Sequence, residues 1–460
     1  MATIAIHDLI TLQQGGYRDA NLTHLKLASP LTSFPEEILS LGLSLTTLDL
    51  SGTGLSSLPS NLGAALPNLK TILLDNCSFA IFPSEAVSSC PNLTIVSLAN
   101  NQISSIPEDI PLPSALETLI VTNNRLTSLP KVPFVPCKNL SILRLSHNSL
   151  TSLPRWLFTS LPSLSQLSFA ANPCCTACQV PNGVHRGCCA LADIPFKELE
   201  QQSEEPVPSL GFTTATVCKG QWKQSEEYAE EVAVLTFWGK KGEQEMDVWI
   251  EAGAHESLLS VWGRVTGHPG EDTDEEEGFK GAIVAQLVPE GYYPLAKPPS
   301  ALDLGISSTT EEDSQPLELS HSSALAMLAS IAGALSHLHE QGIAHGNLHP
   351  SNILASTELE HALLVGFGEA TIYRHGNLSE RSGVEKIEVL AFAKVLEHVL
   401  GLVKPGSEGD EERERLVRRG LEELRARCSA PGVEERPAFE EIREALEEMV
   451  GWRRMMRIPG

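Results

Sequence analysis

The sequence predicts a chain of two parts, a repetitive α/β solenoid followed by a separate α+β domain. Two observations lead to this expectation. Leu-x-x-Leu-x-Leu units recur through the first 180 residues and then stop. Further along, a helical apolar pattern over Ala324–His339 leads into a polar loop, His345–Asn352, which an apolar strand follows. A chain of 460 residues has room for two to four domains, so both parts can bury a core of their own.

The charge of the chain is unevenly distributed. The net charge is −25, of which −3 falls in residues 1–200 and −22 in residues 201–460. The acidic second half is therefore a poor partner for nucleic acid or an anionic membrane. The N-terminus lacks the pattern of a signal peptide, and no apolar run is long enough to span a bilayer. We expect a cytoplasmic or nuclear location, with the ten cysteines as free thiols.

The repeats are regular in both spacing and content. They are 23 or 24 residues apart and begin at Leu22, Leu45, Leu69, Leu93, Leu116, Leu140 and Leu164. Alternating leucines make a short strand with its apolar side chains pointing inward. The pattern resembles the leucine-rich-repeat family in its short form. The resemblance implies that residues 1–180 form a solenoid of seven repeats with stacked parallel strands.

One position in each repeat is reserved for a polar side chain. Asn101, Asn124, Asn148 and Asn172 fall at the position whose amide satisfies backbone groups of the turn. Thr53 takes this place in one earlier repeat, and Cys77 takes it in another.

The solvent side of the strands is the concave face, and we expect it to bind a protein partner. Four apolar residues lie there, on neighbouring strands, where water is expected, and an arginine joins them. These partner-binding candidates are Leu73, Ile95, Ile120, Ile142 and Arg144. An exposed apolar patch on a solenoid favours a protein ligand. The alternative is a strand face that is only solvated.

A cysteine cluster follows the last repeat, in residues 174–189. Its members, weak candidates for a zinc site with His185 nearby, are Cys174, Cys175, Cys178, Cys188 and Cys189. Their irregular spacing favours a small buried cap with reduced thiols, and therefore no bound metal. A sensor of metal or oxidation is a further alternative. We expect residues 181–207 to form this cap and a linker.

The loop His345–Asn352 reads His-Gly-Asn-Leu-His-Pro-Ser-Asn. It resembles the catalytic loop H-R-D-L-x-x-x-N of the protein-kinase family. The resemblance implies a bilobal α+β kinase-like domain over residues 208–452, with a tail at 453–460. The segment Glu388–Ala393 resembles a later helix of the family, and the segment Arg436–Ile442 resembles its closing helix.

The resemblance also implies that the chemistry of the family is lost. Asn347 replaces the catalytic Asp, Leu235 replaces the phosphate-binding Lys, and Gly366 replaces the metal-binding Asp. An amide cannot act as a general base at neutral pH. Two vestiges remain as cofactor-binding candidates, Asn352 at the second-metal position and Gly211 at the start of the glycine-rich loop.

Three further expectations concern the first lobe. Leu210–Gly211 opens a strand whose hairpin partner is Val217–Trp222. Residues His255–Thr266 form the helix that carries the partner glutamate of the lysine, with Leu259 at that position and Glu256 one turn earlier. Lys219 is a candidate substitute for the missing lysine, although a strand lysine is usually solvated.

Two functions remain open. The first is a signalling scaffold in which the repeats bind a protein and a pseudokinase domain docks a second protein, such as an active kinase, without a cofactor. The alternative is a divergent ATP- and Mg²⁺-dependent serine/threonine kinase. The loss of several charged groups favours the first, because phosphoryl transfer depends on positioning and charge stabilisation.

Overall fold

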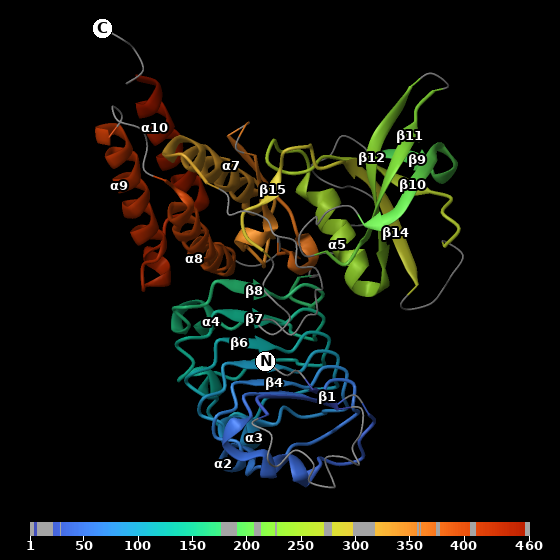
Figure 1. Cartoon of the computed structure of the whole chain (residues 1–460), viewed down its shortest axis with the longest axis vertical. Coiled ribbons are helices and arrows are strands. Elements are labelled where there is room, and N and C mark those ends of the chain that lie inside the picture. The colour runs from blue at the N-terminus through green and yellow to red at the C-terminus, as the bar shows by residue number, and fades with distance from the viewer. Residues whose placement is uncertain are drawn as a thin grey trace. The chain divides into compact units, whose positions relative to one another are not determined.

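The structure is a computed structural model in which the chain divides into two compact units (Figure 1). Unit 1 comprises Met1–Ala177 with Pro299–Thr309, and unit 2 comprises Cys178–Pro298 with Thr310–Gly460. The structure describes residues 4–6, 22–27, 29–175, 191–206, 213–225, 228–270, 278–297, 318–356, 358, 360–373, 378–404 and 411–455.

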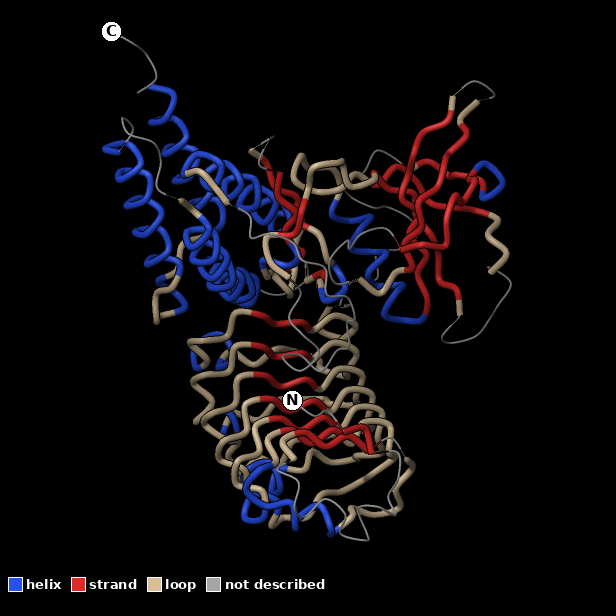
Figure 2. The backbone as a smooth tube through the Cα atoms, viewed as in Figure 1, coloured by secondary structure: helices blue, strands red, loops and turns tan. Residues whose placement is uncertain are grey.

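Unit 1 is a solenoid built on one parallel sheet, seen as a ladder of short strands in Figure 2. Seven strands begin two residues after the predicted repeat starts, which confirms the repeat frame. An eighth strand at the N-terminal edge was not predicted. The strands, in sheet order, are β1 (Ile4–Ile6), β2 (His24–Leu27), β3 (Thr47–Asp49), β4 (Thr71–Leu73), β5 (Ile95–Ser97), β6 (Thr118–Ile120), β7 (Ile142–Arg144) and β8 (Gln166–Ser168).

The chain returns between strands through loops and short helices. Inward side chains such as Leu48, Ile72, Val96, Leu119 and Leu143 are fully buried and stack from repeat to repeat. A single repeat could not bury this face alone, so the array is the stable unit. The helices are η1 (Glu36–Ser44), α2 (Leu62–Ala65), α3 (Ser84–Ser88), η2 (Val132–Phe134) and α4 (Trp156–Ser160).

The asparagine ladder is confirmed. Asn124 Nδ2 donates to the carbonyls of Leu98, Val121 and Thr122, and Asn124 Oδ1 accepts the N–H of Ile103. The other three ladder asparagines bond their turns in the same way. These amides supply partners for buried backbone groups that no strand satisfies.

Unit 2 begins with a six-stranded sheet. The strands, in sheet order, are β10 (Leu199–Pro206), β11 (Thr216–Lys223), β12 (Ala229–Trp238), β14 (Phe279–Gln286), β13 (Val261–Thr266) and β9 (Ala192–Pro195). Only the β13–β9 pair is parallel. A short helix, η3 (Phe196–Glu198), connects β9 to β10, and helix α5 (Gly239–Ala252) connects β12 to β13.

Three expectations about this sheet were wrong. Residues 192–206 form β9 and β10, where we expected a linker. The hairpin partner of β11 is therefore β10, which ends before Leu210. The helix lies at Gly239–Ala252, and the stretch predicted as helical, His255–Thr266, is a turn followed by strand β13.

The rest of unit 2 is mainly helical. Helix α7 (His321–Glu340) confirms the prediction of a helix before the polar loop, and α10 begins at Phe439, within the predicted closing segment. The other elements, in chain order, are β15 (Tyr293–Pro294), β16 (Ile343–Ala344), η4 (Pro350–Asn352), β17 (Ile353–Ser356), β18 (His361–Leu364), η5 (Phe367–Glu369), β19 (Thr371–Ile372), α8 (Leu378–Leu402), α9 (Glu411–Cys428), η6 (Val433–Glu435) and α10 (Phe439–Met455).

One apolar core joins the sheet to the helices of unit 2. It includes Leu235 and Ile283 from the strands, Trp249 from α5, and Leu335 and Phe392 from α7 and α8. Within the described part of the chain, no helix is both long and apolar enough to cross a membrane.

Candidate functional site

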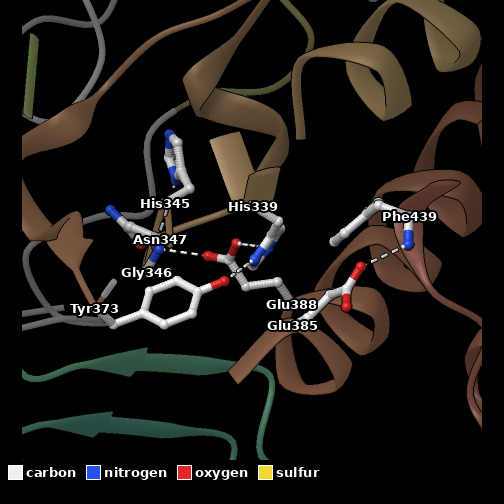
Figure 3. Close-up of polar contacts among 8 residues, drawn as sticks. All are labelled: His339, His345, Gly346, Asn347, Tyr373, Glu385, Glu388 and Phe439. Carbon is white, nitrogen blue, oxygen red and sulfur yellow. Dashed lines mark hydrogen bonds and ion pairs between the residues drawn. The ribbon is translucent and has the colours of Figure 1, made fainter. Parts of the chain in front are cut away.

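A buried carboxylate of helix α8, Glu388, accepts a hydrogen bond from the backbone of the polar loop His345–Asn352 (Figure 3). The backbone N–H of Gly346 donates to Glu388 Oε1 at 2.5 Å. His345 Nε2 lies 2.9 Å from the carbonyl oxygen of Val365, and Asn352 Nδ2 donates to the carbonyl oxygen of Asn347 at 2.8 Å. Gly346 has a φ of 71°, a left-handed conformation that favours glycine. The loop is therefore fixed at both ends and across its middle.

Glu388 also closes a buried chain of hydrogen bonds, drawn in Figure 3. His339 Nε2 lies 2.8 Å from Glu388 Oε2, and His339 Nδ1 lies 2.6 Å from the Tyr373 hydroxyl. Burial alone would raise the pKa of Glu388, but the hydrogen bond and charge of His339, with His345 and the Gly346 N–H, lower it overall. Burial, followed by the charge of Glu388, raises the pKa of Tyr373.

Three of the predicted site positions, Asn347, Asn352 and Gly366, lie in or next to this loop. Asn347 is half-buried, Asn352 is buried, and the N–H of Val365, just before Gly366, donates to the carbonyl oxygen of Asn352. Gly366 has a φ of 87° at the start of η5. The three positions therefore lie in adjoining segments, and none of them carries a carboxylate.

Leu235 lies on strand β12 and is fully buried. It pairs in register with Val217 of β11 and Ile283 of β14, inside the apolar core. An apolar side chain in this place offers no charge to a phosphate. The candidate substitute, Lys219, is half-buried on β11, and its Nζ lies 2.7 Å from Glu231 Oε1.

Glu245 of α5 is the buried carboxylate nearest in sequence to this strand. Its Oε1 accepts the Thr213 hydroxyl at 2.5 Å, and its Oε2 accepts the backbone N–H and the hydroxyl of Thr214 at 2.6 and 2.5 Å. The side chain of Trp249, one turn further, also donates to Glu245 Oε1. We call these three residues, Glu245, Thr213 and Thr214, the Glu–Thr clasp. It ties the start of strand β11 to helix α5.

A row of aromatic rings and one ion pair join α5 to the segment after Gly366. The ring centroids of Trp249 and Phe367 are 5.0 Å apart, and those of His345 and Phe367 are 5.5 Å apart. Lys241 Nζ lies 3.0 Å from Oε1 of the buried Glu369. Helix α5, η5 and the polar loop therefore form one packed assembly.

The concave face of unit 1 differs in part from its prediction. The strand register puts Leu73, Ser97 and Ile120 in one row, and Ile95, Thr118 and Ile142 in the next. All four apolar candidates are half-buried, and a polar residue separates them within each row. Arg144, expected to face solvent, is buried, and so is Ser97 of the same row. Ser97 donates to Asp75 Oδ1, and Arg144 Nη2 donates to Gln166 Oε1.

The cysteine cluster is described only at its start. Cys174 and Cys175 are half-buried thiols, and Cys175 Sγ donates to the carbonyl oxygen of Phe169. Cys178, Cys188, Cys189 and His185 lie outside the described residues, as does Gly211. Among the residues that are described, no group of three or more histidine, cysteine or acidic side chains is placed to hold a metal ion.

Sequence reasoning missed Glu245, although the sequence contains a signal for its helix. Gly253 ends α5 with a φ of 68°, as glycine commonly does after a helix. In strand β13, Val261 and Val265 frame an alternating pattern that is typical of a strand. The helix prediction for His255–Thr266 gave too little weight to both features.

Comparison with known families identifies the class of unit 1. A family model described as leucine rich repeat matches residues 114–173. A two-copy model of leucine rich repeats matches residues 88–134, and a single-repeat model matches residues 44–65. None of the curated proteins matches the chain. The N-terminal part therefore contains leucine-rich repeats, and such domains generally mediate interactions between proteins.

Proposed function

We propose that the chain is a protein-binding scaffold whose unit 2 is a kinase-like domain that does not transfer phosphate. In kinases a lysine on the third strand pairs with a glutamate of the following helix. The third strand of the antiparallel run β10–β11–β12 carries Leu235, and the following helix carries Glu245. The Glu–Thr clasp is the observation that carries the proposal, because this carboxylate is already occupied without any nucleotide or lysine.

The polar loop His345–Asn352 supports the same proposal. Glu388, His345 and Asn352 hold its frame in place, so the loop has a defined conformation. The positions that would supply a base and a metal carboxylate are Asn347 and Gly366. A neutral amide does not hold Mg²⁺ against its hydration without carboxylates. The domain therefore retains a shape for docking other proteins and lacks the groups that stabilise phosphoryl transfer.

Phosphate transfer tests the enzymatic part of this proposal. We expect the full chain to transfer no radiolabelled γ-phosphate from ATP to itself or to a mixture of peptide substrates. An Asn352→Ala variant is the matched control for any signal. Transfer by the wild type that this variant abolishes would support the alternative, a divergent serine/threonine kinase.

The proposal that the chain is a scaffold also includes a protein partner bound to the concave face of unit 1. Its half-buried apolar side chains, such as Ile120 and Ile142, lie on neighbouring strands of a rigid array. We expect Ile120→Glu to abolish cross-linking of the full chain to its partner in cell extract, as read by mass spectrometry. Glu117→Lys, a charge change on an exposed residue just before β6, is the control. Equal cross-linking by the Ile120 variant would contradict this surface.

A further inference from the structure

A small open cavity with a mixed polar and apolar lining lies among the loops that follow strands β3, β4 and β5 of unit 1. Its volume is about 300 Å³, and its apolar lining includes Leu58, Phe79, Ile81, Phe82 and Ile110. This volume is at the low end for ligand sites, which span roughly 300–1,000 Å³. A single side chain of a partner fits it better than a cofactor does.

The repeat frame shows that this place is exceptional within the solenoid. Ile81 stands two residues before the proline of its repeat, where the other repeats have Ser57, Ser105, Ser128 and Ser152. The side chain of Ile81 is 59% exposed, at the edge of the cavity. The side chain of Ile81 does not contribute to the core of the solenoid, because the next residue, Phe82, fills the inward position of this repeat.

Three carboxylates belong to the segments that line the cavity. Glu85 lines it, and Glu108 with Asp109 lies between two lining residues, Pro107 and Ile110. All three side chains belong to exposed residues. In the part of the chain that the structure describes, none of the three has an ion-pair partner. The rim therefore carries a local negative charge that a cationic partner would complement.

A buried residue, Ser84, also belongs to the lining of the cavity. It is only 2% exposed, and its Oγ has no hydrogen-bond partner among the described residues. Buried polar groups in proteins are normally paired.

We propose that this cavity is a second docking site, which takes a peptide segment with one apolar side chain between lysines or arginines. A second copy of the chain fits less well, because a net charge of −25 opposes self-association. All of the cavity's lining residues belong to unit 1, and none of them lies on a strand. The site therefore goes beyond the proposed function and stands or falls independently of it.

Fluorescence anisotropy of the full chain with a labelled peptide, Lys-Arg-Leu-Arg-Lys, tests the apolar part of the site. The variant Ile81→Ser restores the residue of the other repeats, so it should fold normally. We expect it to weaken binding by about tenfold, the effect of losing part of one apolar contact. Val135→Ser, a change at another exposed apolar residue of unit 1, should leave the affinity unchanged.

The charge of the rim is tested with the same peptide. The triple variant Glu85→Gln, Glu108→Gln, Asp109→Asn should weaken binding and reduce its dependence on salt. A peptide with serine in place of leucine should bind the wild type as weakly as the leucine peptide binds the Ile81 variant. If wild type and Ile81→Ser bound the peptide equally, the peptide would be binding to the acidic second half of the chain and not in the cavity. Either that result or no binding at millimolar peptide would overturn the proposal.

Discussion

The buried carboxylate of Glu388 is the residue on which the polar loop depends most. It accepts hydrogen bonds from the Gly346 N–H and from His339, and it is only 2% exposed. The resemblance predicted a helical segment starting at Glu388, whereas α8 begins ten residues earlier, at Leu378, and the hydrogen bonds of Glu388 were not predicted. Nothing in the sequence between residues 339 and 388 indicates that a histidine and a glutamate so far apart meet. Such long-range pairs depend on tertiary packing, which local patterns do not encode.

Removing this carboxylate should destabilise unit 2. We expect Glu388→Ala to lower the free energy of unfolding by about 3 kcal/mol, since it leaves a buried N–H and a buried imidazole without their acceptor. Urea denaturation measures the change. Glu422→Ala, in an exposed pair with Arg418 on α9, is the matched control and should change stability by less than about 1 kcal/mol. If Glu388→Ala unfolded at the same urea concentration as the wild type, the hydrogen bonds of Glu388 would contribute nothing to stability.

Two histidines of unit 2 should make its stability depend on pH. Burial and the charge of His337 lower the pKa of His255 below 6.5, and burial lowers that of His361, while Glu256 opposes both shifts. The unfolded chain therefore binds protons first as the pH falls. Stability should be full above pH 6.5 and should decline below it, until the folded-state pKa values are passed.

Urea midpoints at several pH values between neutral and about pH 5 measure this effect. The decline should be smaller in a His255→Gln variant, which cannot take up the proton. A stability that rises as the pH falls through this window would contradict the stated sign.

Among the elements, strands and repeats were easier to predict than the helix that matters most. The seven repeat strands follow from one leucine every two or three residues, a pattern that repeats seven times. Helix α5 has a mixed sequence, with Gly242 in its first turns, and no comparable repetition. Strands β9 and β10 lie in a stretch rich in charge and proline, which resembles a linker by composition. Their strand form depends on pairing with β13 and β11, and a local sequence does not reveal such partners.

The Glu–Thr clasp should hold the start of β11 against α5. We expect Glu245→Ala to speed hydrogen exchange of the amides in residues 214–220 and to lower stability by about 2 kcal/mol, because four donors lose their acceptor. Glu243→Ala, an exposed position on the same helix, is the control. Unchanged exchange in the Glu245 variant would mean that the clasp does not order the strand.

At the scale of the whole molecule, the chain combines a repeat array with a strongly acidic second half. The array was predictable because each repeat contacts mainly its neighbours, so a local pattern determines the architecture. The concave face was predicted only in part, since exposure within it depends on packing beyond the repeat, as Ser97 and Arg144 show. The residue types at positions 235, 347 and 366 could be read from the sequence. The contacts of the buried carboxylates Glu245 and Glu388 could not.

We propose that unit 2 closes its own kinase-like site and binds no nucleotide. The melting temperature of the full chain with and without Mg·ATP tests this claim most directly. A ligand at 100 times its dissociation constant stabilises a protein by about 2.7 kcal/mol, which is readily measured. We predict no shift for the wild type, with MgCl₂ alone as the control. A saturable upward shift that depends on ATP concentration would contradict the account.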